Sequence, residues 1–178
     1  MKKKLTHNNR VGILGGTFDP PHSGHLYISK IIIKELKLKS LTWIITRQNP
    51  FKKKPYLSES KRIILSKKIL AKEKKIFVKI QNNNLQSKST FDLLYYLKKK
   101  NKSLNFYFII GSDNLIQFHK WKNWKKISSL AKIVVFPRSG YILKAFKSVA
   151  AKKLKKEDLI HINAKKINIS SSLIRKFW

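Results

Sequence analysis

The chain has 178 residues, 42% hydrophobic and 11% aromatic, which argues against disorder and suits one compact domain with residues 1–9 as a basic N-terminal tail. It has no cysteine and no apolar run of the roughly 20 residues that a membrane helix needs, which excludes disulfides, thiolate metal sites and a membrane span. The net charge of +33, from 41 Lys or Arg against 8 Asp or Glu, favours anionic substrates or partners.

Short apolar runs predict the strands of a sheet. They cover residues 11–14, 41–46, 76–80, 106–110 and 133–136, with a weaker run at 159–162. Most of these runs are almost continuously apolar, as expected for strands that are buried on both faces of a sheet.

Segments with helical periodicity lie between these runs. They cover residues 25–38, 59–74 with Ser58 as the N-cap, 90–100, 123–130 and 143–155, and a last helix starts near Ser171. Alternating strands and helices predict an α/β fold, in which a parallel sheet is covered by helices on both faces. Because ligands of such sheets bind at the carboxyl ends of the strands, the loops that leave the strands are the candidate functional loops.

The first of these loops reads Gly-Gly-Thr-Phe-Asp-Pro-Pro-His-Ser-Gly-His, from Gly15 to His25. Glycine lets a backbone approach a phosphate closely, and the helix start that follows offers free N–H groups and the positive end of a dipole. His22 and His25 share the first helical turn, where both imidazoles can donate hydrogen bonds to phosphate oxygens. The spacing is neither a P-loop nor the dinucleotide fingerprint, and a zinc pair would lack an obvious source of further ligands.

This eleven-residue segment resembles the signature of the nicotinate-nucleotide adenylyltransferases, a family of the nucleotidyltransferase superfamily. The resemblance continues in matching order from Val11 to Arg175 and implies a Rossmann-like parallel sheet of nucleotidyltransferase type. It assigns ATP binding to Gly15, Gly16, Thr17 and Phe18, and catalysis to His22 and His25, with the histidines acting on the triphosphate.

Two further segments resemble parts of the mononucleotide site of this family. Asn49-Pro50-Phe51-Lys52 resembles the family's Asn-Pro-x-Lys/His loop, which implies that Asn49 and Lys52 contact the mononucleotide phosphate. Thr90 matches the central threonine of Ser-Tyr-Thr-x-x-Thr-Leu, although the tyrosine and the second threonine of that motif are missing here. Read without the resemblance, these segments are a basic surface turn and a helix cap.

The fourth predicted strand runs into Gly111-Ser112-Asp113-Asn114-Leu115, with Phe118 and Trp121 beyond it. This order resembles the family's Ile-Gly-x-Asp-x-Leu and Phe-x-x-Trp block, which implies that Gly111 and Asp113 bind ATP and that Trp121 stacks on the nicotinate ring. A carboxylate at the end of a central strand can accept hydrogen bonds from ribose hydroxyls, and an indole suits a flat cationic pyridinium. The alternatives are a helix N-cap for Asp113 and core packing for Trp121.

Near the end of the chain, Ile169-Ser170-Ser171-Ser172-Leu173-Ile174-Arg175 resembles the family's Ile-Ser-Ser/Ala-Thr/Ser-x-Ile-Arg segment. Serines that open a helix, with an arginine one turn further along, can bind an anion, and a simple capped helix is the alternative. The resemblance assigns the ATP triphosphate to Ser171, Ser172 and Arg175, with Arg175 among the catalytic residues. Members of the family usually extend further beyond this arginine than this chain does.

The implied reaction is transfer of the adenylyl group of ATP to nicotinic acid mononucleotide, giving nicotinic acid adenine dinucleotide and pyrophosphate in NAD biosynthesis. Mg²⁺ would enter with ATP, held mainly by the phosphates and not by a protein metal site. The mononucleotide phosphate is mostly dianionic at neutral pH, so it needs no general base. Catalysis is then expected to rest on positioning and electrostatics.

Two other classes of function are open at this stage. A related adenylyltransferase could use nicotinamide mononucleotide or phosphopantetheine, although the phosphopantetheine family shows Thr-x-x-Gly-His and lacks the Phe-x-x-Trp block. A basic nucleic-acid-binding domain would explain the charge, but not two phosphate-binding helix starts. Only five of the 41 basic residues are Arg, and the lysines are spread along the chain, which favours compositional bias. We therefore expect a cytoplasmic enzyme with no obligatory nucleic-acid partner and no membrane association.

Overall fold

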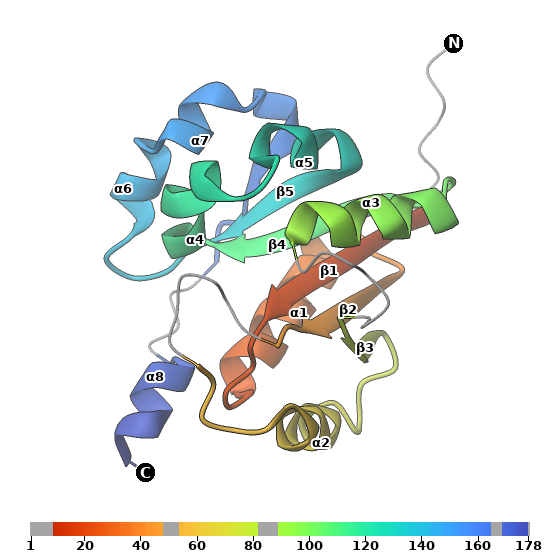
Figure 1. Ribbon diagram of the computed structural model, residues 1–178, viewed down its shortest axis with the longest axis vertical. Helices are drawn as coiled ribbons and strands as arrows, with labels where there is room; N and C mark the ends of the chain where they lie inside the picture. The colour runs from red at the N-terminus through yellow and green to blue at the C-terminus, as the bar shows by residue number, and fades with distance from the viewer. Residues whose placement is uncertain (1–8, 48–53, 82–88, 165–168, 178) are drawn as a thin grey trace.

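The computed structural model describes residues 9–47, 54–81, 89–164 and 169–177, and its strands form one central sheet (Figure 1). The strands are β1 (Arg10–Gly16), β2 (Ser40–Ile45), β3 (Ile76–Ile80), β4 (Asn105–Gly111), β5 (Ala131–Phe136) and β6 (Leu159–His161). All neighbouring strands are parallel, in the order β3-β2-β1-β4-β5-β6. The predicted Rossmann-like parallel sheet is therefore confirmed.

The helices alternate with the strands. They are α1 (Ser23–Glu35), α2 (Glu59–Ile69), α3 (Thr90–Lys100), α4 (Ser112–Gln117), α5 (Trp124–Leu130), α6 (Ile142–Phe146), α7 (Val149–Lys153) and α8 (Ser171–Ile174). Short 3-10 turns lie at Phe118–Lys120, Lys156–Asp158 and Arg175–Phe177. Within the described ranges, no helix is long and apolar enough to cross a membrane.

Two of these helices differ from the sequence-based expectation. The single helix predicted over residues 143–155 is wrong, because α6 ends at Phe146 and Ser148 caps a separate helix α7 by accepting from the Ala151 N–H at 3.2 Å. Helix α4, which begins directly after β4, was not among the predicted helices, although a helix N-cap at Asp113 was an alternative.

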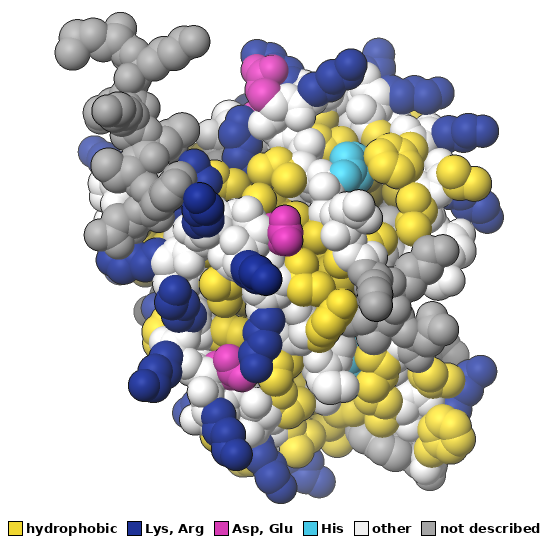
Figure 2. Space-filling view, turned by 180° about the vertical axis from the view of Figure 1, so that it is seen from behind, with side chains coloured by type: hydrophobic (Ala, Val, Ile, Leu, Met, Phe, Trp, Pro, Cys, Tyr) yellow, Lys and Arg dark blue, Asp and Glu magenta, His cyan; other side chains and the backbone are white. Residues whose placement is uncertain are grey.

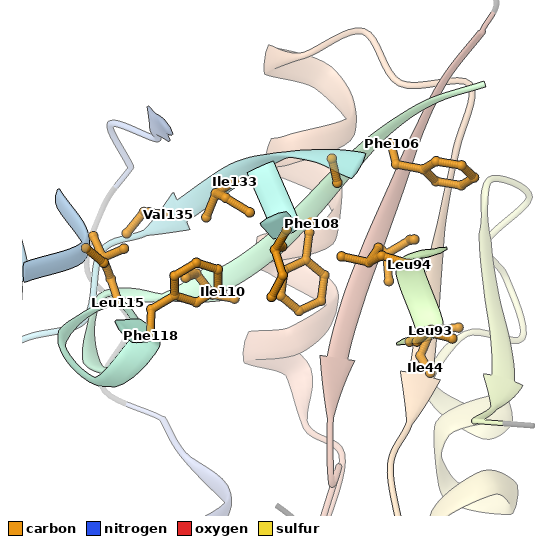
Figure 3. Packing of buried hydrophobic residues seen from close by; sticks show 14 of the residues in the cluster. Ile44, Leu93, Leu94, Phe106, Phe108, Ile110, Leu115, Phe118, Ile133 and Val135 are labelled. Carbon is orange, nitrogen blue, oxygen red and sulfur yellow. The ribbon is translucent and has the colours of Figure 1, made fainter. Parts of the chain in front are cut away.

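Both faces of the sheet are buried, because alternate residues along the strands pack into two separate cores. On β4, Phe106, Phe108 and Ile110 belong to one core, and Tyr107 and Ile109 belong to the other. The first core includes side chains of α3, α4, α5, α6 and α7, and Figure 3 shows its packing around β4 and β5. The second core includes side chains of α1 and α2.

The strand order reverses between β1 and β4. Strands β2 and β3 follow β1 outward in one direction, whereas β5 and β6 follow β4 in the other. In open parallel sheets, the crevice outside the carboxyl ends of the strands at this switch point is where ligands bind. The topology therefore places the candidate site beyond Gly16 of β1 and Gly111 of β4.

On the face that Figure 2 shows, the positive charge has no obvious single focus. In the view from behind, Lys and Arg side chains are scattered over the visible face, with few Asp or Glu side chains among them (Figure 2). This distribution agrees with the interpretation that most of the charge is solvated.

Candidate active site

A cavity of about 740 Å³ lies at the carboxyl ends of the strands, at the switch point. Most of the residues that the sequence singled out line it: Gly15, Gly16, Thr17, Phe18, His22, His25, Thr90, Gly111, Trp121, Ser171, Ser172 and Arg175. Asp113 is not among the lining residues, and Asn49 and Lys52 lie outside the described residues. One cavity therefore brings together segments from both ends of the chain.

The first loop is anchored in the core by Phe18. This side chain is only 2% exposed and stacks on Trp43 of β2, with ring centroids 4.9 Å apart. Phe18 has a φ of 50°, in the left-handed region that non-glycine residues rarely adopt, so packing holds the backbone against its own preference. The Phe18 side chain therefore supports the loop from beneath, and the loop presents its backbone to the cavity.

The two histidines form a contacting pair at the start of α1. Their ring centroids lie 3.8 Å apart, and the His22 backbone N–H donates to His25 Nδ1 at 3.2 Å. Because Nδ1 accepts, the neutral His25 ring carries its proton on Nε2. Gly24 leaves room for this arrangement, since a Cβ there would lie 2.7 Å from Ile169 Cγ2 and 2.9 Å from His22 Nδ1.

His22 is neutral at physiological pH. Burial, and secondly the positive charge of Arg138, lower its pKa from 6.5 to about 4. Its Nδ1 atom is buried and has no hydrogen-bond partner among the described residues. His22 can therefore act on an anion as a hydrogen-bond donor or an oriented dipole, and not as a permanent cation.

Asp19 joins three segments of the cavity wall. Its carboxylate accepts from the backbone N–H groups of Tyr56 and Leu57, both at 2.9 Å, and lies 3.6 Å from the Arg175 guanidinium. Arg175 also donates to the Asp19 carbonyl oxygen. Asp19, only 4% exposed, therefore ties the first loop to the segment before α2 and to the C-terminal segment.

The C-terminal wall of the cavity rests on the first loop. The Ser171 hydroxyl donates to the Pro20 carbonyl oxygen at 2.8 Å, and Arg175 Nη2 donates to Ser172 Oγ at 3.2 Å. Ser170, which was not assigned from the sequence, is the N-cap and accepts from the Leu173 N–H at 3.1 Å. Because α8 has only four residues, its contribution to anion binding must come from side chains more than from a helix dipole.

Arg62 holds the loops that leave β1 and β2. This guanidinium is 2% exposed, and its Nη1 atom donates to the carbonyl oxygens of Thr17 and Thr46, both at 2.7 Å. Nη2 donates to the Arg47 carbonyl oxygen at 3.4 Å. Burial lowers the pKa of Arg62, while the charges of Asp19 and Glu59 raise it.

Asp113 pairs with Arg138 on the opposite side of the switch point. Arg138 Nη1 lies 3.3 Å from Asp113 Oδ2, and the Arg138 N–H donates to Ser112 Oγ at 2.9 Å. A Cβ on Gly111 would collide with the Asp113 carboxylate and lie 2.9 Å from Arg138 Nε, so a larger residue there would displace this ion pair. Arg138 lines the cavity, whereas the predicted contact between Asp113 and ribose stays a prediction.

Trp121 lies at an end of the cavity that is partly lined by aromatic side chains. The Trp121 ring lies 5.1 Å from the Phe118 ring and 6.2 Å from the Phe108 ring, yet it also lines the cavity. Thr90, the first residue of α3, lines the same cavity beside its N-cap Ser89. One part of the Trp121 ring packs on the core, and another part of the ring borders the cavity. Core packing and ligand contact are therefore compatible for this residue.

The cavity is electropositive. The described residues that line it include the cations Lys54, Lys120, Lys122, Arg138 and Arg175. Among all the described lining residues, Asp19 carries the one carboxylate. That carboxylate is already engaged by two N–H groups and Arg175. No group of three or more His, Cys, Asp or Glu side chains that could hold a metal occurs among the described residues. The site thus offers donors and positive charge to a polyanion such as a nucleoside triphosphate.

The model of the family described as cytidylyltransferase-like matches residues 13–177. A probable nicotinate-nucleotide adenylyltransferase of Pelagibacter ubique is 49% identical over 167 residues, which cover 94% of this chain and 92% of that protein. The chain belongs to the nicotinate-nucleotide adenylyltransferases. A probable member from Parvibaculum lavamentivorans is 34% identical over 154 residues, or 86% of this chain and 77% of that protein.

The fold agrees with that of solved members of the family. The Plasmodium falciparum nicotinic acid mononucleotide adenylyltransferase complexed with NaAD superposes with a TM-score of 0.76 at 24% identity, over 95% of this chain and 83% of that one. Nucleotidyltransferases of this kind generally use a divalent metal ion with ATP.

Among the site residues that were not assigned from the sequence are Asp19, Arg62, Arg138 and Ser170. Asp19 stood inside the motif that the sequence singled out, and the scarcity of carboxylates was a usable signal for it. The scarcity of arginine was a similar signal, because Arg62 and Arg138 are two of only five in a lysine-rich chain.

Proposed function

We propose that the chain transfers the adenylyl group of ATP to nicotinic acid mononucleotide, releasing pyrophosphate and forming nicotinic acid adenine dinucleotide for NAD biosynthesis. The observation that carries this proposal is the meeting of two segments far apart in sequence. The loop from Gly15 to His25 and the Ser171–Arg175 segment line one electropositive cavity and touch through the Ser171–Pro20 hydrogen bond. The names of the relatives support the same reaction.

The reaction needs positioning more than proton transfer. A phosphate oxygen of the mononucleotide attacks the α-phosphorus of ATP, forming one P–O bond while the bond to the pyrophosphate oxygen breaks. The nucleophile is already an anion near pH 7, so no base has to remove a proton. The main obstacles are repulsion between two anions and the charge that develops on the leaving pyrophosphate.

The residues divide this work between them. His25, through the proton on Nε2, and His22, as a neutral donor, would stabilise the developing charge on the triphosphate. Ser171, Ser172 and Arg175 supply further donors from the facing wall. Gly15, Gly16, Thr17, Phe18 and Gly111 form the backbone cradle, and Mg²⁺ accompanies ATP as part of the substrate complex.

The acceptor occupies the other part of the cavity. Thr90 and the exposed part of Trp121 would bound the nicotinate ring, with Lys120 and Lys122 close by to favour a negatively charged acceptor. Asp113 would hold a ribose, while Asn49 and Lys52 would hold the mononucleotide phosphate. We place the enzyme in the cytoplasm, with ATP and nicotinic acid mononucleotide as its partners.

Pyrophosphate release with ATP and Mg²⁺ tests this proposal, comparing nicotinic acid mononucleotide, nicotinamide mononucleotide and phosphopantetheine as acceptors. We expect strong preference for the first acceptor. If pyrophosphate is released only with another acceptor, the adenylyl-transfer reaction is supported and the proposed acceptor is wrong. No release from folded protein with any acceptor, together with RNA or DNA binding that falls steeply with salt, would replace the proposal with the nucleic-acid function.

A further inference from the structure

Arg62 occupies a position where two neighbouring loops leave the sheet. The β1–β2 ladder extends to the hydrogen bond from the Thr46 N–H to the Gly16 carbonyl oxygen, at 2.9 Å. The carbonyl groups of Thr17 and Thr46 point to a common donor, Nη1 of Arg62, with both contacts at 2.7 Å. Buried carbonyls need a donor, so the guanidinium continues the connection between the loops where the backbone ladder stops.

The donor comes from outside the cavity. Arg62 lies on α2 and does not line the cavity, whereas Thr17 and Thr46, whose carbonyls its Nη1 atom binds, do. Its side chain is 2% exposed, and no carboxylate lies within 4.0 Å of it among the described residues. A buried cation whose hydrogen-bond partners are loop carbonyls costs desolvation energy, which the charges of Asp19 and Glu59 offset in part from a greater distance.

We infer that Arg62 is a positioning residue that fixes the ATP loop relative to the segment after β2, and so couples the two substrate subsites without touching either substrate. This inference rests on the proposed function, in which Thr17 belongs to the ATP cradle and Thr46 leads toward the mononucleotide segment. It predicts that loss of the guanidinium changes the apparent affinity for both substrates at once.

The test uses two variants of Arg62 and a matched control. Arg62→Met keeps most of the apolar stem and removes both donors, while Arg62→Lys can place one ammonium near the Nη1 position and donate to both carbonyls. Arg10→Met is the control, because Arg10 Nη1 also donates to a backbone carbonyl, that of Leu36 at 3.3 Å, but from the amino end of β1. Kinetics are measured well below the unfolding temperature of each variant, with each substrate varied in turn.

We expect Arg62→Met to raise KM for both substrates and to lower kcat/KM by about tenfold or more, as for the loss of one hydrogen bond to a charged group. Arg62→Lys should recover part of this loss, and Arg10→Met should stay close to the wild type. If Arg62→Met lowers the unfolding temperature but leaves kcat and both KM values within about twofold of the control, the residue is only structural and the inference is wrong.

Hydrogen exchange separates this inference from the proposed function. If the wild-type protein releases no pyrophosphate, the proposed function fails on its own. The position of the loops is then judged from peptides that contain Thr17 and Thr46. Faster exchange of these peptides in Arg62→Met than in Arg10→Met supports the positioning role, and equal exchange in the two variants overturns it.

Discussion

The two segments that the sequence identified as phosphate-binding are built in different ways. The first loop is supported by Phe18 in the core, by Arg62 at its carbonyls and by the 13-residue helix α1. The C-terminal segment has a four-residue helix with no buried residue. Both segments have small residues before a helix in the sequence. The first loop is nevertheless held by the core and a long helix, whereas the C-terminal segment has no buried residue in its helix.

The C-terminal segment takes its position from the first loop. Its contacts with that loop are the Ser171–Pro20 hydrogen bond, the Arg175 contacts with Asp19 and the close approach of Ile169 to Gly24. Damage to the first loop should therefore cost both stability and activity. Damage to the contacts between the segments should cost substrate affinity and leave the fold in place.

Phe18→Ala should have the largest effect on the fold. Removing a fully buried ring that stacks on Trp43 should lower the free energy of unfolding by about 3–5 kcal/mol, as for other buried Phe→Ala substitutions. Urea unfolding followed by circular dichroism measures this change. Phe77→Ala is the control, because Phe77 is 50% exposed, and an equal loss in the two variants would show that the first loop is not anchored by Phe18.

His22→Ala should have the largest effect on the chemistry. Loss of one donor to developing charge should lower kcat by about 10²-fold, with little change in KM for ATP. Single-turnover pyrophosphate release gives the rate of the chemical step. His161→Ala is a suitable control, since His161 contacts Phe146 and does not line the cavity. A near-wild-type rate for the His22 variant would remove this histidine from the catalytic residues.

Asp19→Asn should separate the two segments without unfolding the sheet. The amide keeps one acceptor oxygen but loses the charge that Arg175 faces, so KM for ATP should rise by about tenfold. Stability should fall less than in Phe18→Ala. Asp158→Asn removes the carboxylate of a similar pair with Lys132 away from the cavity, and the same KM in both variants would mean that Asp19 does not position Arg175.

The buried imidazole should make stability depend on pH. The folded-state pKa of His22, about 4, lies below the ordinary value of 6.5, so the unfolded chain binds the proton first. The free energy of unfolding should therefore fall as pH drops from about 6.5 toward 4, by about 1 kcal/mol between pH 7 and 5.5 from this residue. Comparing wild type with His22→Ala over this range isolates the effect. Parallel pH profiles would contradict the prediction.

Ser171→Ala should have the smallest effect. It removes one neutral hydrogen bond between the segments, so KM for ATP should rise by about threefold while the unfolding free energy hardly changes. Ser129→Ala removes the same kind of bond, from a serine hydroxyl to the Lys126 carbonyl oxygen, on an exposed helix. A response no larger than that of this control would show that the Pro20 contact does not support binding.

The sequence predicted the strands well because each is a short apolar run, and the central strands β1, β4 and β5 are largely buried. The helices were harder where capping decided the outcome. Ser148 was a readable N-cap inside the region predicted as one helix, but the apolar periodicity around it suggested continuity. Helix α4 was not among the predicted helices because Gly111-Ser112-Asp113 can also be a loop, and the packing of Leu115 into the core was not visible in the sequence.

The candidate site was predictable where motifs are contiguous and unpredictable where the fold brings distant groups together. The loop from Gly15 to His25 carries its chemistry in one stretch. Arg62 instead acts on carbonyl groups 16 and 45 residues away, and Asp19 acts across 156 residues on Arg175. Nothing in the local sequence specifies such partners, because backbone carbonyls and N–H groups are present at every position.

The dependence of the C-terminal segment on the first loop has a consequence for how the protein is made. During synthesis, residues 10–136, which contain the five longest strands, leave the ribosome before residues 170–175. The histidine pair can therefore be in place on a nascent chain while the facing wall is still inside the exit tunnel. Because Ser171 must find Pro20 across 151 residues, the triphosphate pocket is complete only after residues 170–175 have left the ribosome.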